Sequence, residues 1–200
     1  MANSLSERIG AKFDKSLSVL QHMAHDTALR AQVVDAVAVA VAALRAGNKL
    51  LFAGNGGSAA DAQHWAGELV SRFYFDRPGL SAIALTTDTS ILTAIGNDYG
   101  YDYVFARQIE ALAHAGDVFF AISTSGNSKN ILRAIKAARA RGVKTIGFTG
   151  QSGGAMAEHC DLCFKVPSGE TPRIQEGHEF LGHLLCGLIE HEMFGSTHGG

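Results

Sequence analysis

The sequence is 200 residues long, with 46% hydrophobic and 18% charged side chains and a formal net charge of −2. This length supplies a substantial core for one soluble domain and is short for two domains joined by a linker. A net charge near zero argues against a broad nucleic-acid-binding face, which requires clustered positive charge. We therefore expect a single domain over residues 1–200, with no nucleic-acid partner. Loops and helix ends, rather than a positive field, would hold any phosphorylated ligand.

The sequence gives no sign of export or membrane insertion. Met1–Leu20 has charged residues spread through it and lacks the unbroken apolar segment of a signal peptide. The stretch Val33–Leu44 is apolar but shorter than a membrane span, and predicts a buried helix. Cys160 and Cys163 form one C-x-x-C without the second pair that a zinc ribbon needs, and the total of three cysteines does not indicate a disulfide framework. These features predict a cytoplasmic protein with no membrane partner.

The first part of the chain, residues 4–46, has helical periodicity. Apolar residues recur at three- and four-residue steps from Leu5 to Leu20, and again from Leu29 to Leu44. Asp26 or Thr27 is suited to begin the second helix, and Gly47 to end it. We expect two consecutive helices before the rest of the fold.

From Lys49 onward, short apolar runs alternate with helical patterns. Most of these runs lack polar alternation, as expected of strands that are covered on both faces. The order predicts an α/β fold: a three-layer sandwich with a five-stranded parallel sheet flanked by helices, preceded by the N-terminal helices. The expected strands are Leu50–Ala53, Ser81–Leu85, Val118–Ile122, Thr145–Phe148 and Leu162–Val166; the expected helices are Ser58–Phe73, Asp102–Ala113, Lys129–Arg141, Ala155–Glu158 and Arg173–Met193; and the tail Ser196–Gly200 is expected to be disordered.

Three loops that follow strands have an unusual composition. They are Gly54–Ser58, Ser123–Ser128 and Gly150–Gly154, and the first two open directly into helices. In open parallel sheets, ligands bind beyond the carboxyl ends of the strands. Glycine allows close backbone approach, hydroxyls donate hydrogen bonds, and a helix N-terminus carries partial positive charge. Residues 123–128 include four hydroxyls around one glycine, more than helix capping requires, and predict a phosphate site.

A dinucleotide site is an alternative for the first of these loops. Gly54, Gly56 and Ala59 fit the loose pattern G-x-G-x-x-A. The acid that binds ribose should follow about 20 residues later at the end of the next strand, whereas Asp88 arrives too late. The chain also has no second domain to hold a hydride acceptor, so the match remains weak.

Two helical segments carry imidazole and carboxylate groups. His64 and Glu68 are four residues apart on one helix face, and the last helix carries Gln175, Glu179 and His183. Such groups from two helices can form a zinc site or a general acid and base, whereas His64 and Glu68 alone would make only a weak surface pair. Gln175 and His183 lie about 12 Å apart along an unbroken helix, so Glu179 and His183 are the easier pair to bring onto one ligand.

Taken together, these motifs resemble one known family. The segments are Gly54–Ser58, Gln63-His64 with Glu68, Gly96–Asp98, Ser123–Ser128 and Arg173–Glu176. Their order and separations are similar to those of the phosphoheptose isomerases, in the sugar isomerase (SIS) domain superfamily. The similarity extends from about Leu50 to Met193, while the N-terminal helices match in pattern only. The resemblance implies a flavodoxin-like SIS fold.

The resemblance also implies a reaction and a set of site residues. The reaction converts sedoheptulose 7-phosphate to D-glycero-D-manno-heptose 7-phosphate through a cis-enediol, as the first step towards a nucleotide-activated heptose. It implies one Zn²⁺ per subunit and a homotetramer with sites near subunit interfaces. Transferred by motif, proton transfer falls to Glu68 and His183; zinc ligation to His64, Glu68, Gln175 and His183; and substrate binding to Asn55, Gly56, Gly57, Glu68, Asn97, Asp98, Ser123, Thr124, Ser125, Ser128 and Gln175.

A non-catalytic branch of the same superfamily is the second interpretation. Proteins of that branch bind the bacterial replication initiator and keep the fold and the serine-rich loop. They lack the acid and the histidine at the positions of Glu68 and His183, and differ at Gly57. This chain has all three isomerase residues, which favours the enzyme.

Overall fold

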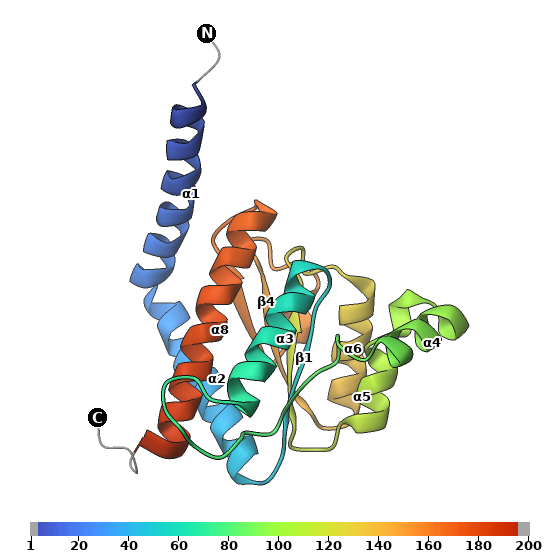
Figure 1. Cartoon of the computed structure of the whole chain (residues 1–200). Coiled ribbons are helices and arrows are strands. Elements are labelled where there is room, and N and C mark those ends of the chain that lie inside the picture. The colour runs from blue at the N-terminus through green and yellow to red at the C-terminus, as the bar shows by residue number, and fades with distance from the viewer. Residues whose placement is uncertain (1–3, 196–200) are drawn as a thin grey trace.

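The computed structural model describes residues 4–195, and its centre is a five-stranded parallel sheet with helices on both faces (Figure 1). The expected tail Ser196–Gly200 lies outside the described residues. The strand order is β2-β1-β3-β4-β5, and every pairing is parallel. The predicted fold class is therefore confirmed. The strands are β1 (Leu50–Ala53), β2 (Ala82–Ala84), β3 (Val118–Ile122), β4 (Lys144–Gly150) and β5 (Leu162–Val166).

Two apolar cores, one on each face of the sheet, hold the helices in place. Leu50 and Phe52 of β1 point into the core beneath α2, α3 and α8, whereas Leu51 and Ala53 point into the core beneath α5 and α6. Because both faces are covered, the central strands contain no polar alternation. The helices of these layers are α2 (Thr27–Arg45), α3 (Gly57–Val70) and α8 (Thr171–Phe194) on one face, and α5 (Ala106–Leu112), α6 (Lys129–Ala140) and α7 (Met156–His159) on the other.

The two N-terminal helices meet at Asp26. Its carboxylate accepts hydrogen bonds from the amides of Ala28 and Leu29, which caps the start of α2 as predicted. Gly47, with φ of 81°, follows the end of α2. By length and composition α2 could cross a membrane, but its apolar face from Leu29 to Ala43 is buried in the core. The prediction of a buried helix in this segment is confirmed.

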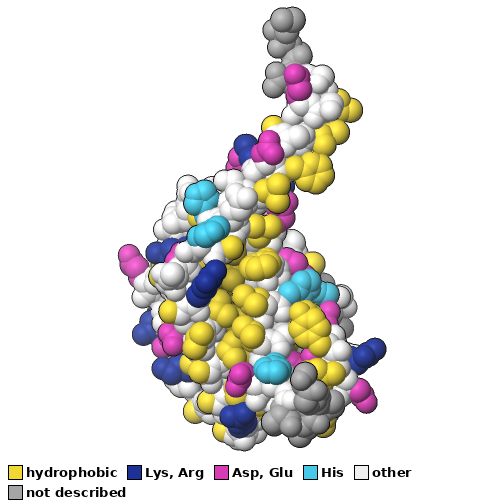
Figure 2. Space-filling view, turned by 90° about the vertical axis from the view of Figure 1, so that its left-hand side faces the viewer, with side chains coloured by type: hydrophobic (Ala, Val, Ile, Leu, Met, Phe, Trp, Pro, Cys, Tyr) yellow, Lys and Arg dark blue, Asp and Glu magenta, His cyan; other side chains and the backbone are white. Residues whose placement is uncertain are grey.

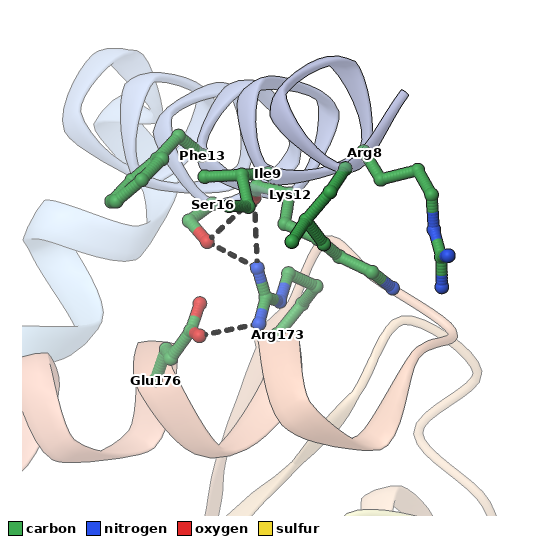
Figure 3. A pocket seen from close by; sticks show the side chains of 8 residues that line it. Arg8, Ile9, Lys12, Phe13, Ser16, Arg173 and Glu176 are labelled. Carbon is green, nitrogen blue, oxygen red and sulfur yellow. Dashed lines mark hydrogen bonds and ion pairs between the residues drawn. The ribbon is translucent and has the colours of Figure 1, made fainter. Parts of the chain in front are cut away.

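Helix α1 (Leu5–His25) extends beyond the body of the molecule (Figure 1). Arg173, at the start of α8, donates to the carbonyl of Lys12 at 3.0 Å and to the hydroxyl of Ser16, and pairs with Glu176 at 2.6 Å (Figure 3). Polar contacts thus attach the middle of α1, while its apolar stripe remains exposed (Figure 2).

The structure differs from the sequence prediction between β2 and β3. Helix α4 (Thr89–Tyr99) was not predicted, and the expected helix Asp102–Ala113 is split into a 3₁₀ turn, η1 (Tyr101–Tyr103), and the short α5. No residue of α4 is fully buried, and only Leu92 and Ile95 pack against the core, so its apolar periodicity is weak. Strand β2 is also shorter than predicted and only partly buried, as befits an edge strand. The remaining boundaries agree within a few residues.

Candidate active site

The first two unusual loops leave neighbouring strands at one edge of the sheet. Strands β1 and β3 are paired in parallel, so their carboxyl ends lie side by side. The helix that follows β1 covers one face of the sheet, and the helix that follows β3 covers the other. This is a topological switch point, where open α/β sheets bind their ligands. We call Gly54–Ser58 the glycine loop and Ser123–Ser128 the serine loop.

The glycine loop depends on glycine at two positions. Gly56 has φ of 57° and ψ of −122°, a conformation that other residues rarely adopt. A Cβ atom on Gly57 would collide with the side-chain amide of Gln175, so this glycine allows α8 to approach the loop. Gln175, which the resemblance assigned to substrate and zinc, therefore lies against the glycine loop.

Asn55 connects the glycine loop to the start of α6. Its amide group exchanges two hydrogen bonds with that of Asn130, at 2.9 and 2.8 Å. The hydroxyl of Tyr101 also donates to Asn55 Oδ1 at 3.2 Å. Neither Asn130 nor Tyr101 was assigned to the site from the sequence. Their only signal was their position, directly after the serine loop and after the Gly96–Asp98 motif.

The hydroxyls of the serine loop face one another. Ser123 Oγ lies 2.9 Å from Ser128 Oγ and 3.5 Å from Ser125 Oγ. Ser128 occupies the N-cap position of α6, yet its side chain makes no capping hydrogen bond. Capping therefore does not account for this hydroxyl, and it remains available to a ligand.

The third glycine-rich loop supports the serine loop from below. Gly126 has φ of 66°, and a Cβ atom there would collide with the carbonyl of Gly153. The amide of Gly150 donates to the carbonyl of Thr124 at 3.1 Å. All three predicted loops thus meet at one edge of the sheet, and the third contacts the backbone of the serine loop at Thr124 and Gly126.

A second group of functional side chains lies between α3 and α8. His64 Nε2 is 2.8 Å from His183 Nε2 and 3.2 Å from Glu179 Oε1, and His183 Nε2 is 3.1 Å from the same oxygen. Glu68 Oε1 lies 3.5 Å from His64 Nε2. We call these four residues the α3–α8 cluster. The sequence predicted that His64, Glu68 and His183 would meet, and the structure brings them together.

The donors of this cluster fit a zinc ion. One ligand atom from each of His64, Glu179 and His183 lies within 4.8 Å of the others. Two imidazole nitrogens and a carboxylate oxygen are one of the donor sets of catalytic zinc sites. The carboxylate in this group is Glu179, whereas the family pattern assigned Glu68 and Gln175. The sequence marked Glu179 only as the easier partner of His183.

Helices α3 and α8 pack closely around the cluster and orient its side chains. Gly182 lies directly against the ring of Trp65, where a Cβ atom would collide. The Trp65 indole donates to Glu179 Oε2 at 3.0 Å and orients that carboxylate. Burial, and then the nearby charge of Glu179, raises the pKa of Asp61 to about 7. Asp61 Oδ2 is buried without a hydrogen-bond partner among the described residues, so the cluster has a further acidic neighbour.

The glycine loop and the α3–α8 cluster lie at different positions along α3. The helix begins at Gly57, and Glu68 lies eleven residues further on, about 16 Å along the helix axis. Asn97 and Asp98 lie on the exposed helix α4, where the Asn97 side chain donates to Asp98 at 2.8 Å. No hydrogen bond among the described residues joins them to the serine loop. Asp88, the alternative ribose-binding acid, caps α4 by accepting from the amide of Ile91.

Comparisons with known proteins agree with this architecture. The SIS domain family matches residues 13–150. Phosphoheptose isomerase 2 of Campylobacter jejuni is 56% identical over 192 residues, which are 96% of each chain. Phosphoheptose isomerase of Burkholderia pseudomallei (strain 1710b) is 59% identical over 177 residues, which are 88% of this chain and 90% of that protein.

Solved structures give the same result. The phosphoheptose isomerase of Neisseria gonorrhoeae superposes with a TM-score of 0.88 at 45% identity, covering 94% of this chain and 99% of that one. That of Francisella tularensis superposes with a TM-score of 0.90 at 38% identity, covering 94% and 100%. The chain combines a doubly wound parallel sheet with a match to the SIS domain family over residues 13–150, so it is a SIS-domain protein. Within that class, the chain belongs to the phosphoheptose isomerase family.

Proposed function

We propose that this protein is a cytoplasmic aldose–ketose isomerase that converts D-sedoheptulose 7-phosphate to D-glycero-D-manno-heptose 7-phosphate. The observation that carries the proposal is that one fold holds both the serine loop and the α3–α8 cluster. An uncapped hydroxyl loop at the switch point suits a phosphate, and the α3–α8 cluster offers a carboxylate beside two imidazoles. Relatives at 56 and 59% identity are named for this activity. The product is the first intermediate towards a nucleotide-activated heptose.

The serine loop and the glycine loop divide the binding of the substrate. Ser123, Ser125 and Ser128, with Thr124, hold the 7-phosphate at the start of α6, where the helix dipole favours the dianion. In the glycine loop, Asn55 with the backbone of Gly56 and Gly57 contacts the sugar, and Gln175 approaches it from α8. Asn97 and Asp98, on α4, complete this set by binding the sugar hydroxyls.

Proton transfer is the work of Glu68 and His183. The reaction moves one proton between C1 and C2, so a base must take a proton from carbon and an acid must serve the two oxygens. Glu68 takes and returns the carbon proton, and His183 moves protons on the oxygens. His64, Glu179 and His183 are the residues that would hold a Zn²⁺ ion, which would supply Lewis-acid polarisation of oxygen there. Glu179, beside both histidines, supplies the carboxylate for the metal and leaves Glu68 free to act as the base.

The assembly brings the two groups onto one substrate. Within one chain, Glu68 lies far along α3 from the glycine loop, so we propose that a neighbouring subunit presents its α3–α8 cluster to the serine loop in a homotetramer. Exposed apolar side chains of α1, α2 and α8 form a face that could pack against a neighbouring subunit (Figure 2). It includes Phe13 and Val34, which are 66% and 67% exposed, and a groove of about 460 Å³ between α2 and α8. Light scattering should give four times the chain mass.

Isotope exchange tests the activity directly. The protein is incubated in deuterium oxide with a panel of ketose phosphates, including sedoheptulose 7-phosphate, and the product is followed by NMR. An enediol mechanism places solvent deuterium at C2 of the aldose. Aldose that stays free of deuterium even after many reversible turnovers would indicate hydride transfer and overturn the mechanism. No turnover of any ketose phosphate by zinc-loaded protein would overturn the enzyme and favour the initiator-binding branch of the superfamily.

A further inference from the structure

A buried ion pair lies at the far end of the α3–α8 cluster. Arg77 Nε donates to Glu190 Oε1 at 2.9 Å, and neither side chain is exposed to solvent (both 0%). Burial opposes the charge of Glu190, but hydrogen bonds from two backbone amides and from Arg77 lower its pKa, so the carboxylate is ionised. Moving two charges out of water is costly, and an apolar pair in the same place often gives equal stability. Stability alone is therefore a poor explanation for this pair.

The remaining donors of Arg77 reach the helix that carries Glu68. Its guanidinium donates to the carbonyl of Glu68 at 3.0 Å, to that of Leu69 at 2.6 Å and to that of Ser71 at 2.9 Å. The last carbonyls of a helix have no partner within the helix. Ser71, the C-cap of α3, lacks the left-handed conformation of a glycine cap. The guanidinium of Arg77 instead donates to the carbonyls at the end of the helix. The backbone of Glu68 is thus fixed directly by Arg77.

Glu190 holds the segment that packs against His183. Its two oxygens accept hydrogen bonds from the amides of Phe73 at 2.7 Å and Tyr74 at 2.6 Å. The Phe73 ring lies 5.6 Å from the His183 imidazole, measured between ring centres. Gly187 lies between His183 and Glu190 on α8, and its lack of a side chain leaves room for the rings of Phe73 and Tyr74. The position of the imidazole therefore depends on a ring whose backbone Glu190 anchors.

We propose that Arg77 and Glu190 are positioning residues for the isomerase reaction. Arg77 fixes the last turn of α3 with Glu68, and Glu190 fixes Phe73 against His183. One ion pair thereby sets the separation of the carboxylate and the imidazole that share the proton transfers. This inference rests on the proposed function. A displacement of about 1 Å at reacting groups costs on the order of 100-fold in rate, which is the effect such a pair prevents.

The test compares two variants with a matched ion pair elsewhere. Arg77→Lys keeps the charge but loses the planar set of donors, and Glu190→Gln keeps the shape but loses the charge. The control is Asp117→Asn. Asp117 pairs with Lys49 at 2.7 Å, is 1% exposed and accepts from backbone amides, but it lies before β3, away from both loops and the cluster. Urea unfolding of all three variants measures the loss of stability that each change causes.

A positioning role predicts a split between the kinetic constants. Arg77→Lys and Glu190→Gln should lower kcat by about 30-fold or more with KM within about threefold, since geometry rather than binding is lost. Asp117→Asn should leave kcat within about twofold at a similar loss of stability. If kcat falls equally in all three variants, or in none, the pair is only structural and the inference is wrong.

A second readout does not require activity. The ring protons of His183, observed by NMR in metal-free protein, sense the Phe73 ring. They should shift in Glu190→Gln and in Phe73→Leu, but not in Asp117→Asn. Phe73→Leu keeps the ion pair and shows how large a shift the loss of the ring alone causes. Arg77→Lys, which keeps the charge, serves as the test if Glu190→Gln does not fold. Unmoved His183 resonances would overturn the inference even if the protein is an active isomerase, and shifted resonances in an inactive protein would overturn only the proposed function.

Discussion

The serine loop and the α3–α8 cluster solve the problem of building a site in opposite ways. The serine loop takes all its hydroxyls from six consecutive residues, and the end of β3 together with the start of α6 fixes their arrangement. The cluster takes its four side chains from two helices that are more than 100 residues apart in the chain. The arrangement of the serine loop therefore depends on local structure, whereas that of the cluster depends on the packing of α3 against α8. Changes in the cluster should accordingly have the larger effects.

The largest effect should come from Glu68→Gln. Removing the base that moves the carbon proton should lower kcat by about 1,000-fold, in the middle of the range for general base catalysis. Binding of sedoheptulose 7-phosphate, measured by calorimetry, should change little. Glu110→Gln, an exposed carboxylate on α5, is the control and should keep full activity. A near-normal kcat for Glu68→Gln would show that another group is the base.

Metal affinity distinguishes the two sets of zinc ligands. Glu179→Gln should weaken zinc binding by more than about 100-fold, since even the outer partners of metal ligands contribute about 10- to 100-fold. Gln175→Ala should retain the metal, because that side chain lies against Gly57. Competition with a chromogenic chelator measures both affinities. The reverse order would restore the ligand set that the family pattern implies.

A smaller effect is expected in the serine loop. Ser128→Ala removes one hydroxyl from the phosphate site and should raise KM by about 10-fold with kcat nearly unchanged, as for a hydrogen bond to a charged group. Ser81→Ala, an exposed hydroxyl just before β2, provides the comparison. Equal KM values for the two variants would remove Ser128 from the phosphate site.

The smallest effect concerns His178, which links α8 to the strand beneath the serine loop. Its Nε2–H donates to the carbonyl of Thr149 at 3.2 Å, and burial lowers its pKa to about 4. Between this value and its ordinary pKa of 6.5, only the unfolded chain binds the proton, so stability falls as the pH falls. From pH 7 to pH 5.5 this should cost about 1 kcal/mol.

Urea unfolding of metal-free protein measures that dependence. His178→Asn should lose this part of the pH dependence, whereas His25→Asn, an exposed residue on α1, should retain it. Parallel curves for the wild type and His178→Asn would mean that the pKa of His178 is the same in the folded and the unfolded chain.

The sequence predicts the local features of this molecule well and the contacts between distant segments only in part. The boundaries of β1, β3 and β5 agree with the structure, and for β1 and β3 the reason is that buried parallel strands are continuous apolar runs. The serine loop was identified because its composition exceeds what capping requires. Helix α4 was missed because none of its residues is fully buried and only Leu92 and Ile95 pack against the core, which leaves a weak apolar period in its sequence.

The choice between Gln175 and Glu179 shows where sequence reasoning ends. Both residues lie on one face of α8, one turn apart, and spacing favoured Glu179 without deciding the matter. The decision depends on how closely α8 approaches α3, which Gly57 and Gly182 permit at two separate points. A close approach of this kind is a property of the packed pair of helices and leaves no periodic signal in either one.

The exposed stripe of α1 has a consequence for how the protein matures. Leu5, Ile9, Phe13 and Leu17 are between 49% and 69% exposed, so the chain cannot bury them by itself. Covering each such side chain contributes about 1.5 to 3 kcal/mol, and here that energy is released only when another surface arrives. The last step of folding is then bimolecular, and dilution slows it. The resistance of α1 to proteolysis should therefore rise with protein concentration while that of the sheet stays constant.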